Sequence, residues 1–122
     1  SRISANETSN TAPVSVSAGI TTDITGVRVV ALRFKIQPGY HIYGYVSEKD
    51  PYIKTTVEFV LPTGIRPWGE TREPQAEMYN GTTTIYRNDA VYVLPILGNG
   101  TGEITCKVTY QCCDDSICFP PE

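Results

Sequence analysis

Hydrophobic and polar residues alternate along most of this chain, and this alternation predicts β-strands. In residues 27–36 every second side chain from Val30 onward is apolar, whereas Arg33 and Lys35 fall on the opposite face. Residues 53–60 and 103–110 alternate in the same way, so each segment is expected to bury one face against a core. The predicted inward faces consist of Val30, Leu32, Phe34 and Ile36 in the first segment and of Ile104, Cys106, Val108 and Tyr110 in the last.

Turn signals separate these segments at intervals of about ten residues. Pro62-Thr63-Gly64 ends one strand, and residues 98–102 form a tight connection before the last one. Residues 82–87 and 90–96 flank Asn88-Asp89, which predicts a β-hairpin. The sequence contains no helical stripe and no internal repeat. We therefore expect an all-β fold, an antiparallel sandwich that is immunoglobulin-like in architecture.

Length and composition indicate one ordinary globular domain. With 122 residues the chain can bury a core without depending on disulfides. Residues 1–12 are polar, so we expect a flexible segment there and a single domain over residues 13–122. A formal charge of −3 gives no support to binding of nucleic acid or of an anionic membrane, which would need a basic face. No apolar run of about 18 residues is present, so no segment is expected to span a bilayer.

Three of the four cysteines crowd into the polar tail "YQCCDDSICFPPE", residues 110–122. Cys106 lies earlier, in the middle of a predicted strand and on its apolar face, which predicts a buried free thiol. Cys118 can pair with either Cys112 or Cys113, because four or five intervening residues form a compact loop. A bridge between Cys106 and Cys112 is excluded if both lie on one extended strand, where their α-carbons would be roughly 20 Å apart.

Clustered cysteines in a polar tail can belong to a redox pair, a structural disulfide or a metal site. A short exposed ring is typical of a reversible redox pair, whereas an inert structural disulfide is the simplest alternative. A structural zinc site needs four ligands, and a chain with one histidine and no second C-x-x-C does not supply them, so we expect no metal and no cofactor.

Asp114 and Asp115 follow Cys113 directly, and negative neighbours disfavour a thiolate. Such cysteines would react poorly with a generic reagent and would need a dedicated partner.

Three segments resemble, in the right order, the N-terminal periplasmic domain of the thiol:disulfide interchange protein DsbD. "TYQCCDDSICFPPE" (109–122) is similar to the active-site hairpin of that family, with a Tyr-Gln-x-Cys stretch, an acidic loop, and a second Cys before Pro-Pro-Glu. "PGYHIYGY" (38–45) resembles its Gly-aromatic-x-aliphatic-Tyr strand, and "EMYNGTTTIYRNDAVYVLPI" (77–96) its cap loop and the hairpin that follows. Together the matches span residues 35–122.

The resemblance implies an immunoglobulin-like domain whose cysteine pair accepts electrons from a thioredoxin-like domain. It would pass them to periplasmic disulfide isomerases and to a thioredoxin-like protein of cytochrome c maturation, and it would be tethered to a membrane domain in the full-length protein. By match to the motif, Cys113 and Cys118 are the redox pair, and Cys118 forms the mixed disulfide. The other implied site residues are Tyr79 as the aromatic of the cap loop, Glu77 as an acidic cap position, and His41 and Tyr43 as aromatic positions that line the site.

Two departures from the family pattern bear on this interpretation. Four residues separate the two cysteines, where the familiar form has five, and Cys112 stands where a small residue is usual. His41 and Tyr43 also fit a purely structural role as packing residues. The competing function is a binding module, in which the tyrosines of 40–45 and Tyr52 form an aromatic platform for a glycan or protein and the cysteines only close a loop.

Overall fold

The computed structural model describes the backbone of residues 1–122 and all side chains except those of residues 9–11. Within these residues the secondary structure consists of strands and contains no helix. Accordingly, the part of the chain described here has no helix that is long and apolar enough to cross a bilayer. The strands are β1 (Arg2–Ser4), β2 (Thr8–Thr11), β3 (Val14–Thr22), β4 (Arg28–Ile36), β5 (Ile42–Tyr43), β6 (Thr56–Val60), β7 (Ile65–Pro67), β8 (Glu77–Met78), β9 (Thr84–Tyr86), β10 (Asp89–Gly98) and β11 (Thr105–Thr109).

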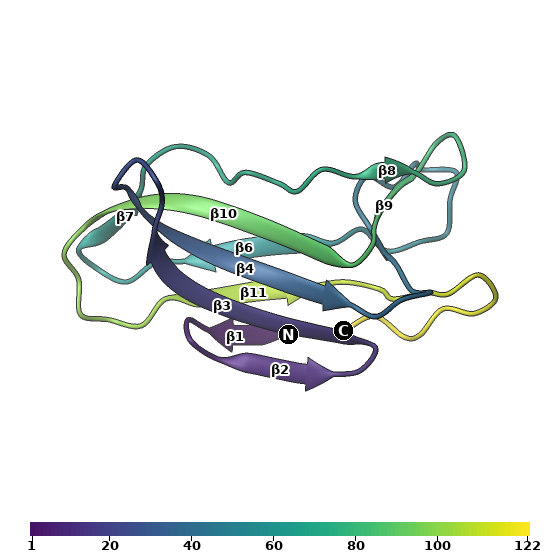
Figure 1. Ribbon diagram of the computed structural model, residues 1–122, viewed down its shortest axis with the longest axis horizontal. Helices are drawn as coiled ribbons and strands as arrows, with labels where there is room; N and C mark the ends of the chain where they lie inside the picture. The colour runs from purple at the N-terminus through teal and green to yellow at the C-terminus, as the bar shows by residue number, and fades with distance from the viewer.

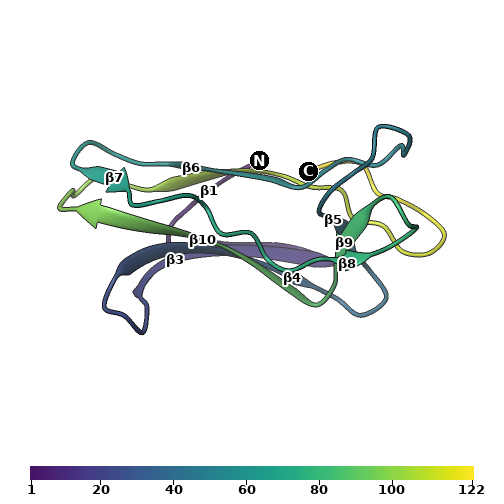
Figure 2. The same cartoon turned by 90° about the horizontal axis from the view of Figure 1, so that it is seen from above.

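The strands form two facing layers, which confirms the predicted antiparallel sandwich (Figure 1). One layer is a five-stranded sheet in the order β2-β3-β4-β10-β7, and the other is a three-stranded sheet in the order β1-β11-β6. Seen from above, the two sheets run roughly along one another with the core between them (Figure 2). Neighbouring strands pair antiparallel throughout.

The core forms from the faces that the alternation predicts. In β4 the predicted inward residues Val30, Leu32, Phe34 and Ile36 are buried, while Arg33 and Lys35 are exposed. From the opposite layer β11 contributes Cys106 and Val108, both buried. Phe34 lies at the centre and makes edge-to-face contacts with Tyr92, at 6.0 Å between ring centroids, and with Tyr110, at 5.5 Å. The two layers are therefore joined by aromatic packing as well as by aliphatic burial.

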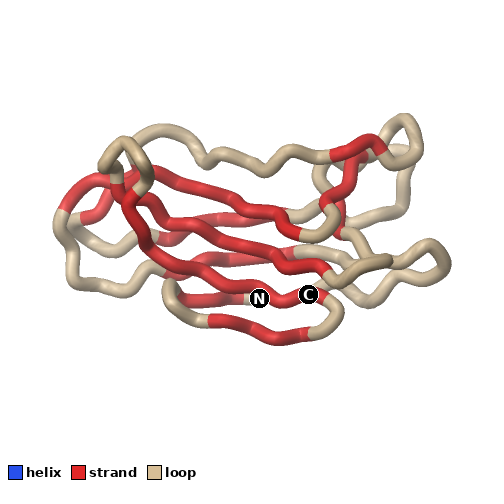
Figure 3. The backbone as a smooth tube through the Cα atoms, viewed as in Figure 1, coloured by secondary structure: helices blue, strands red, loops and turns tan.

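A third, small sheet in the order β5-β9-β8 closes one end of the sandwich. Figure 3 shows these short strands surrounded by loops at that end of the molecule. Gly44, which follows β5, lies so close to β9 that a Cβ atom there would meet Thr84 Oγ1 at 2.7 Å. A residue with a side chain at this position would push the two segments apart, so glycine permits the close approach on which the small sheet depends.

One expectation from the sequence differs from the structure, and a second stays a prediction. The hairpin predicted at Asn88-Asp89 is wrong, because β9 pairs with β5 and β8 whereas β10 pairs with β4 and β7. Asn88 has a positive φ of 63° and turns the chain from the small sheet into the large one. Residues 1–12, expected to be flexible, contain β1 and β2, and Ile3 is buried in the core. Independent motion of this segment stays a prediction.

Because Phe34 touches aromatic residues from both layers, Phe34→Ala is expected to lower the free energy of unfolding by about 3–5 kcal/mol, which urea denaturation monitored by circular dichroism measures. The matched control is Lys35→Ala, the neighbouring residue on the exposed face, which should change stability by less than about 0.5 kcal/mol. Equal losses in the two variants would contradict this assignment of faces.

Candidate functional site

The cysteine tail forms a β-hairpin that continues from the end of β11 and projects beyond the sandwich beside the small sheet (Figure 1). Its two arms, residues 110–112 and 119–122, are joined by backbone hydrogen bonds. Glu122 N donates to Tyr110 O at 2.9 Å, and Phe119 N donates to Cys112 O at 2.9 Å. A disulfide between Cys113 and Cys118 crosses the base of the loop, with the α-carbons 4.0 Å apart. This is the pairing that the family resemblance implies.

The two halves of the disulfide differ sharply in exposure. Cys113 is buried, with 1% of its surface exposed, whereas Cys118 is exposed to solvent. Two backbone hydrogen bonds fix Cys113 to His41: His41 N donates to Cys113 O at 2.9 Å, and Cys113 N donates to His41 O at 3.0 Å. A thiol that approaches from solvent therefore meets the Cys118 half first.

The loop between the cysteines is held by its own acidic residue. The carboxylate of Asp114 accepts hydrogen bonds from the backbone N–H groups of Ser116 and Ile117, each at 2.7 Å. These bonds hold the pKa of the Asp114 carboxyl below its usual range, so the group stays ionised. The loop thus has a defined shape in which the charge of Asp114 is used to cap a turn.

Aromatic side chains surround Cys113. Tyr43 is fully buried and stacks on Tyr52 with 4.4 Å between the ring centroids. Its hydroxyl lies 3.0 Å from Nε2 of His41, which is also fully buried. Tyr79 is half-buried, and its ring lies 4.9 Å from that of His41. His41, Tyr43 and Tyr79, which the sequence predicts as site residues, are thus brought together around Cys113.

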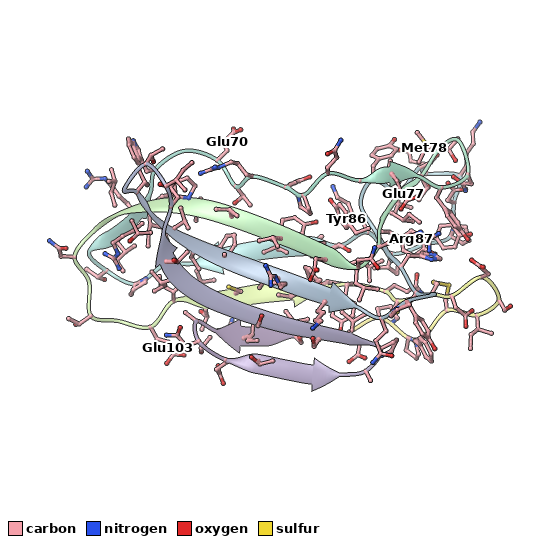
Figure 4. All side chains as sticks on the ribbon, viewed as in Figure 1. Glu70, Glu77, Met78, Tyr86, Arg87 and Glu103 are labelled. Atoms are coloured by element: carbon pink, nitrogen blue, oxygen red, sulfur yellow. A yellow bond between two sulfur atoms is a disulfide. The ribbon has the colours of Figure 1, made fainter. Side chains whose placement is uncertain are left out.

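Glu77, the fourth predicted lining residue, lies at the rim. It belongs to β8, is exposed, and forms an ion pair with Arg87, with 3.3 Å between its Oε1 and the arginine Nε (Figure 4). Such an exposed pair is screened by solvent and contributes little to stability. Burial lowers the pKa of His41, and the positive charge of Arg87 acts in the same direction, so His41 is neutral at pH 7.

A second loop contacts the segment that follows Tyr79, and no sequence pattern predicts this contact. The carboxylate of Asp50 accepts hydrogen bonds from the hydroxyls of Thr82, at 2.8 Å, and of Thr83. These bonds lower the pKa of the Asp50 carboxyl. The backbone N–H groups of Thr82 and Thr83 also donate to Asn80 Oδ1, at 3.2 and 2.8 Å. Asp50 therefore ties residues 80–83 to the loop that carries Tyr52.

The two remaining cysteines are free and buried, as expected for Cys106. Burial raises the pKa of the Cys106 thiol to about 11, and it raises that of Cys112 to about 11 with a smaller contribution from Asp114. Both are therefore neutral thiols at pH 7 and poor nucleophiles. Cys112 packs into the main core, whereas Cys113 faces the aromatic residues of the small sheet.

The described side chains also bear on metal coordination and on the aromatic platform of the competing hypothesis. Among the described side chains, no group of three or more His, Cys, Asp or Glu residues is placed to hold a metal ion. The tyrosines of the competing binding-module hypothesis do not form one exposed platform, because Tyr43 is buried and stacked on Tyr52 whereas Tyr45 is exposed, at 61%. Tyr43, Tyr52 and Tyr79 belong to the cluster that contains Cys113.

Comparison with known proteins agrees with this geometry. The family described as "Thiol:disulfide interchange protein DsbD, N-terminal" matches residues 12–122. The chain is 32% identical over 94 residues to the thiol:disulfide interchange protein DsbD of Cronobacter sakazakii, a match that covers 76% of this chain and 15% of that protein. The chain thus spans less than a sixth of the length of this curated relative.

Two solved structures are also similar. The N-terminal periplasmic domain of ScsB from Proteus mirabilis matches with a TM-score of 0.58 at 14% identity, over 96% of this chain and 48% of that one. The reduced N-terminal domain of DsbD from Neisseria meningitidis matches with a TM-score of 0.48 at 21% identity, over 76% of this chain and 70% of that one. The ScsB domain supports the fold alone. Because the family match extends over residues 12–122 and includes the disulfide hairpin, the chain belongs to the family of DsbD N-terminal domains.

Proposed function

We propose that this domain transfers electrons by thiol–disulfide exchange through Cys113 and Cys118. It accepts electrons from a thioredoxin-like domain and reduces disulfides of periplasmic partners, such as disulfide isomerases and a thioredoxin-like protein of cytochrome c maturation. The observation that carries the proposal is the asymmetric disulfide, with Cys118 exposed and Cys113 buried, at the tip of a hairpin in a domain of this family. The same family membership supports a periplasmic location and a tether to a membrane domain as further parts of this proposal.

The exchange proceeds in two balanced steps. A thiolate of the electron donor attacks Cys118 Sγ, a bond between the two sulfurs forms, and the Cys113–Cys118 bond breaks with its electron pair on Cys113. The other thiolate of the same donor then attacks the donor sulfur of the mixed disulfide. The donor is released with a disulfide of its own, and Cys118 is released as a thiolate. With a partner disulfide the same steps run in reverse, and Cys118 is the attacking sulfur.

The surrounding residues control access to the pair. We propose that Tyr79 acts as the aromatic cap, since its ring packs against His41 and belongs to the same cluster as Cys113. Asp50 positions this cap, because its carboxylate holds Thr82 and Thr83 in the same loop. Partner docking would displace Tyr79 and open the buried half of the disulfide.

Exposure of the two cysteines predicts a clear difference in reactivity. In the reduced Cys113→Ser variant Cys118 should react with 5,5′-dithiobis(2-nitrobenzoate) faster than the buried thiols, because it is the exposed cysteine, although Asp114 and Asp115 should keep it slower than a free thiol. In Cys118→Ser the three remaining thiols are buried, so none should react rapidly without denaturant. The matched control is reduced Cys112→Ala, in which Cys118 should be labelled at the same rate as in the reduced wild-type domain. Rapid labelling of Cys118→Ser would contradict the proposed order of attack.

Reduction should leave the fold intact, because a loop of this length constrains the unfolded chain less than the 15-residue loop that is worth about 3 kcal/mol. We expect a thioredoxin-like dithiol protein to reduce the domain and a disulfide to reoxidise it, with the near-ultraviolet circular dichroism of the aromatic core unchanged. Loss of that signal on reduction would indicate a structural disulfide and contradict the proposed function.

Removal of the cap should expose the disulfide. Tyr79→Ala is expected to speed reduction by dithiothreitol, measured in single-turnover experiments, and Asp50→Asn should act in the same direction by loosening the cap loop. Tyr45→Ala is the matched control, since this tyrosine is exposed and lies outside the cluster. Equal rates for Tyr79→Ala and the control would mean that Tyr79 does not cover the site.

A further inference from the structure

His41, the sole histidine of the chain, is fully buried and has one ring nitrogen without a partner. Nε2 lies 3.0 Å from the Tyr43 hydroxyl, whereas no donor or acceptor among the described residues reaches Nδ1. A buried polar atom without a partner is unfavourable by about 1–3 kcal/mol, so native proteins retain few of them. The open nitrogen therefore calls for a functional explanation.

The hydrogen-bond partners determine which nitrogen carries the proton. If Tyr43 donates its hydroxyl hydrogen to Nε2, the proton of neutral His41 resides on Nδ1 and that N–H is the single unpaired group. In the opposite tautomer both the Tyr43 O–H and the Nδ1 lone pair would be unpaired and buried. The first arrangement leaves fewer groups unpaired, so Nδ1 is a donor that has no acceptor while the disulfide is intact.

The backbone places His41 directly opposite Cys113. His41 and Cys113 are direct cross-strand partners in a β-bridge whose two hydrogen bonds are 2.9 and 3.0 Å long. Side chains of directly opposed residues point to the same face with their Cβ atoms about 4.5–5.5 Å apart. Both residues are buried, at 0% and 1% exposure, and the ring of Tyr79 covers His41. Water therefore has little access to the space between His41 and Cys113.

We propose that His41 is a catalytic residue that donates a hydrogen bond from Nδ1 to the sulfur of Cys113 when the disulfide opens. This inference rests on the proposed exchange function and assigns the group that receives the leaving sulfur. When the donor thiolate bonds to Cys118 Sγ, the electron pair of the broken bond resides on Cys113 Sγ. A disulfide sulfur is a weak acceptor, but a thiolate is a strong one, so the partner of Nδ1–H appears only in the course of the reaction.

Cys113 needs such a donor because its site disfavours charge. A thiolate formed among Tyr43, Tyr52 and Tyr79 is removed from solvent, and desolvation opposes its formation. Neutral His41 keeps its Nδ1 proton, because loss of that proton would leave an imidazolate, and a thiolate is too weak a base to form one. Tyr43 also keeps its hydroxyl proton, because burial raises its pKa. The charged groups around the ring are those of Arg87, Glu77, Asp114 and Asp115, so the nearest fixed charges are mostly negative and do not replace the donor.

Nuclear magnetic resonance of the wild-type domain tests the donor directly. Because the chain has one histidine, long-range ¹H–¹⁵N spectra report His41 alone. In the oxidised protein we expect the tautomer protonated at Nδ1, and reduction should shift the Nδ1 resonance while the proton stays there. The tautomer protonated at Nε2, or an Nδ1 resonance that does not respond to reduction, would overturn the proposal.

Two variants separate hydrogen bonding from packing. His41→Leu removes the donor, and its reduction by dithiothreitol should be slower by about tenfold or more at equal concentrations of dithiothreitol thiolate. His41→Asn carries an amide N–H near the position of Nδ1 and should retain most of the wild-type rate. Equal slowing of both variants, or no slowing of His41→Leu, would contradict the proposal.

These measurements remain informative if the proposed function fails. Should a thioredoxin-like dithiol protein fail to reduce the wild-type disulfide, the exchange function is wrong. The tautomer of His41 and the dithiothreitol rates of the variants would still show whether Nδ1 assists the opening of the disulfide, because neither depends on a protein partner.

Discussion

The two backbone hydrogen bonds between His41 and Cys113 determine the arrangement of the whole site. They connect the hairpin that follows β11, in one layer of the sandwich, to the segment that enters β5 in the small sheet. Since only backbone atoms take part, the position of Cys113 does not depend on the disulfide. Changes of geometry during exchange are therefore concentrated at Cys118, which lies in the short loop and lacks such an attachment.

The charged and apolar parts of the site have separate tasks. Around Cys113 the neighbours are aromatic, and they keep this residue buried from solvent. Three acidic residues near the site have a structural partner: Asp114 caps its own loop, Asp50 holds the hydroxyls of Thr82 and Thr83, and Glu77 pairs with Arg87. The negative charge near the cysteines thus maintains the shape of the loops, while it also disfavours an exposed thiolate.

Much of the architecture is predictable because each long strand buries one face. The alternation in β4 and β11 identifies their inward residues. It leaves the choice between Cys112 and Cys113 as the partner of Cys118 open, and the structure resolves that choice by placing Cys112 in the core. The turn residue Asn88 indicates that the chain changes direction, but it does not indicate which strand β10 pairs with. The predicted hairpin is therefore wrong. The contact of Asp50 with Thr83 joins two loops without any periodic pattern, and no sequence signal identifies it. The roles of Cys118, Tyr79 and Glu77 came from family resemblance.

Cys112 and Cys113 are neighbours in sequence, yet their side chains lie on opposite faces of the hairpin. In the folded chain this separates a free thiol from a disulfide one residue away and prevents their exchange. An unfolded chain has no such partition, and any two of its four thiols can meet. Correct oxidation of this domain thus requires that folding precede disulfide formation, so an oxidant that acts on the nascent chain would produce a mixture of isomers.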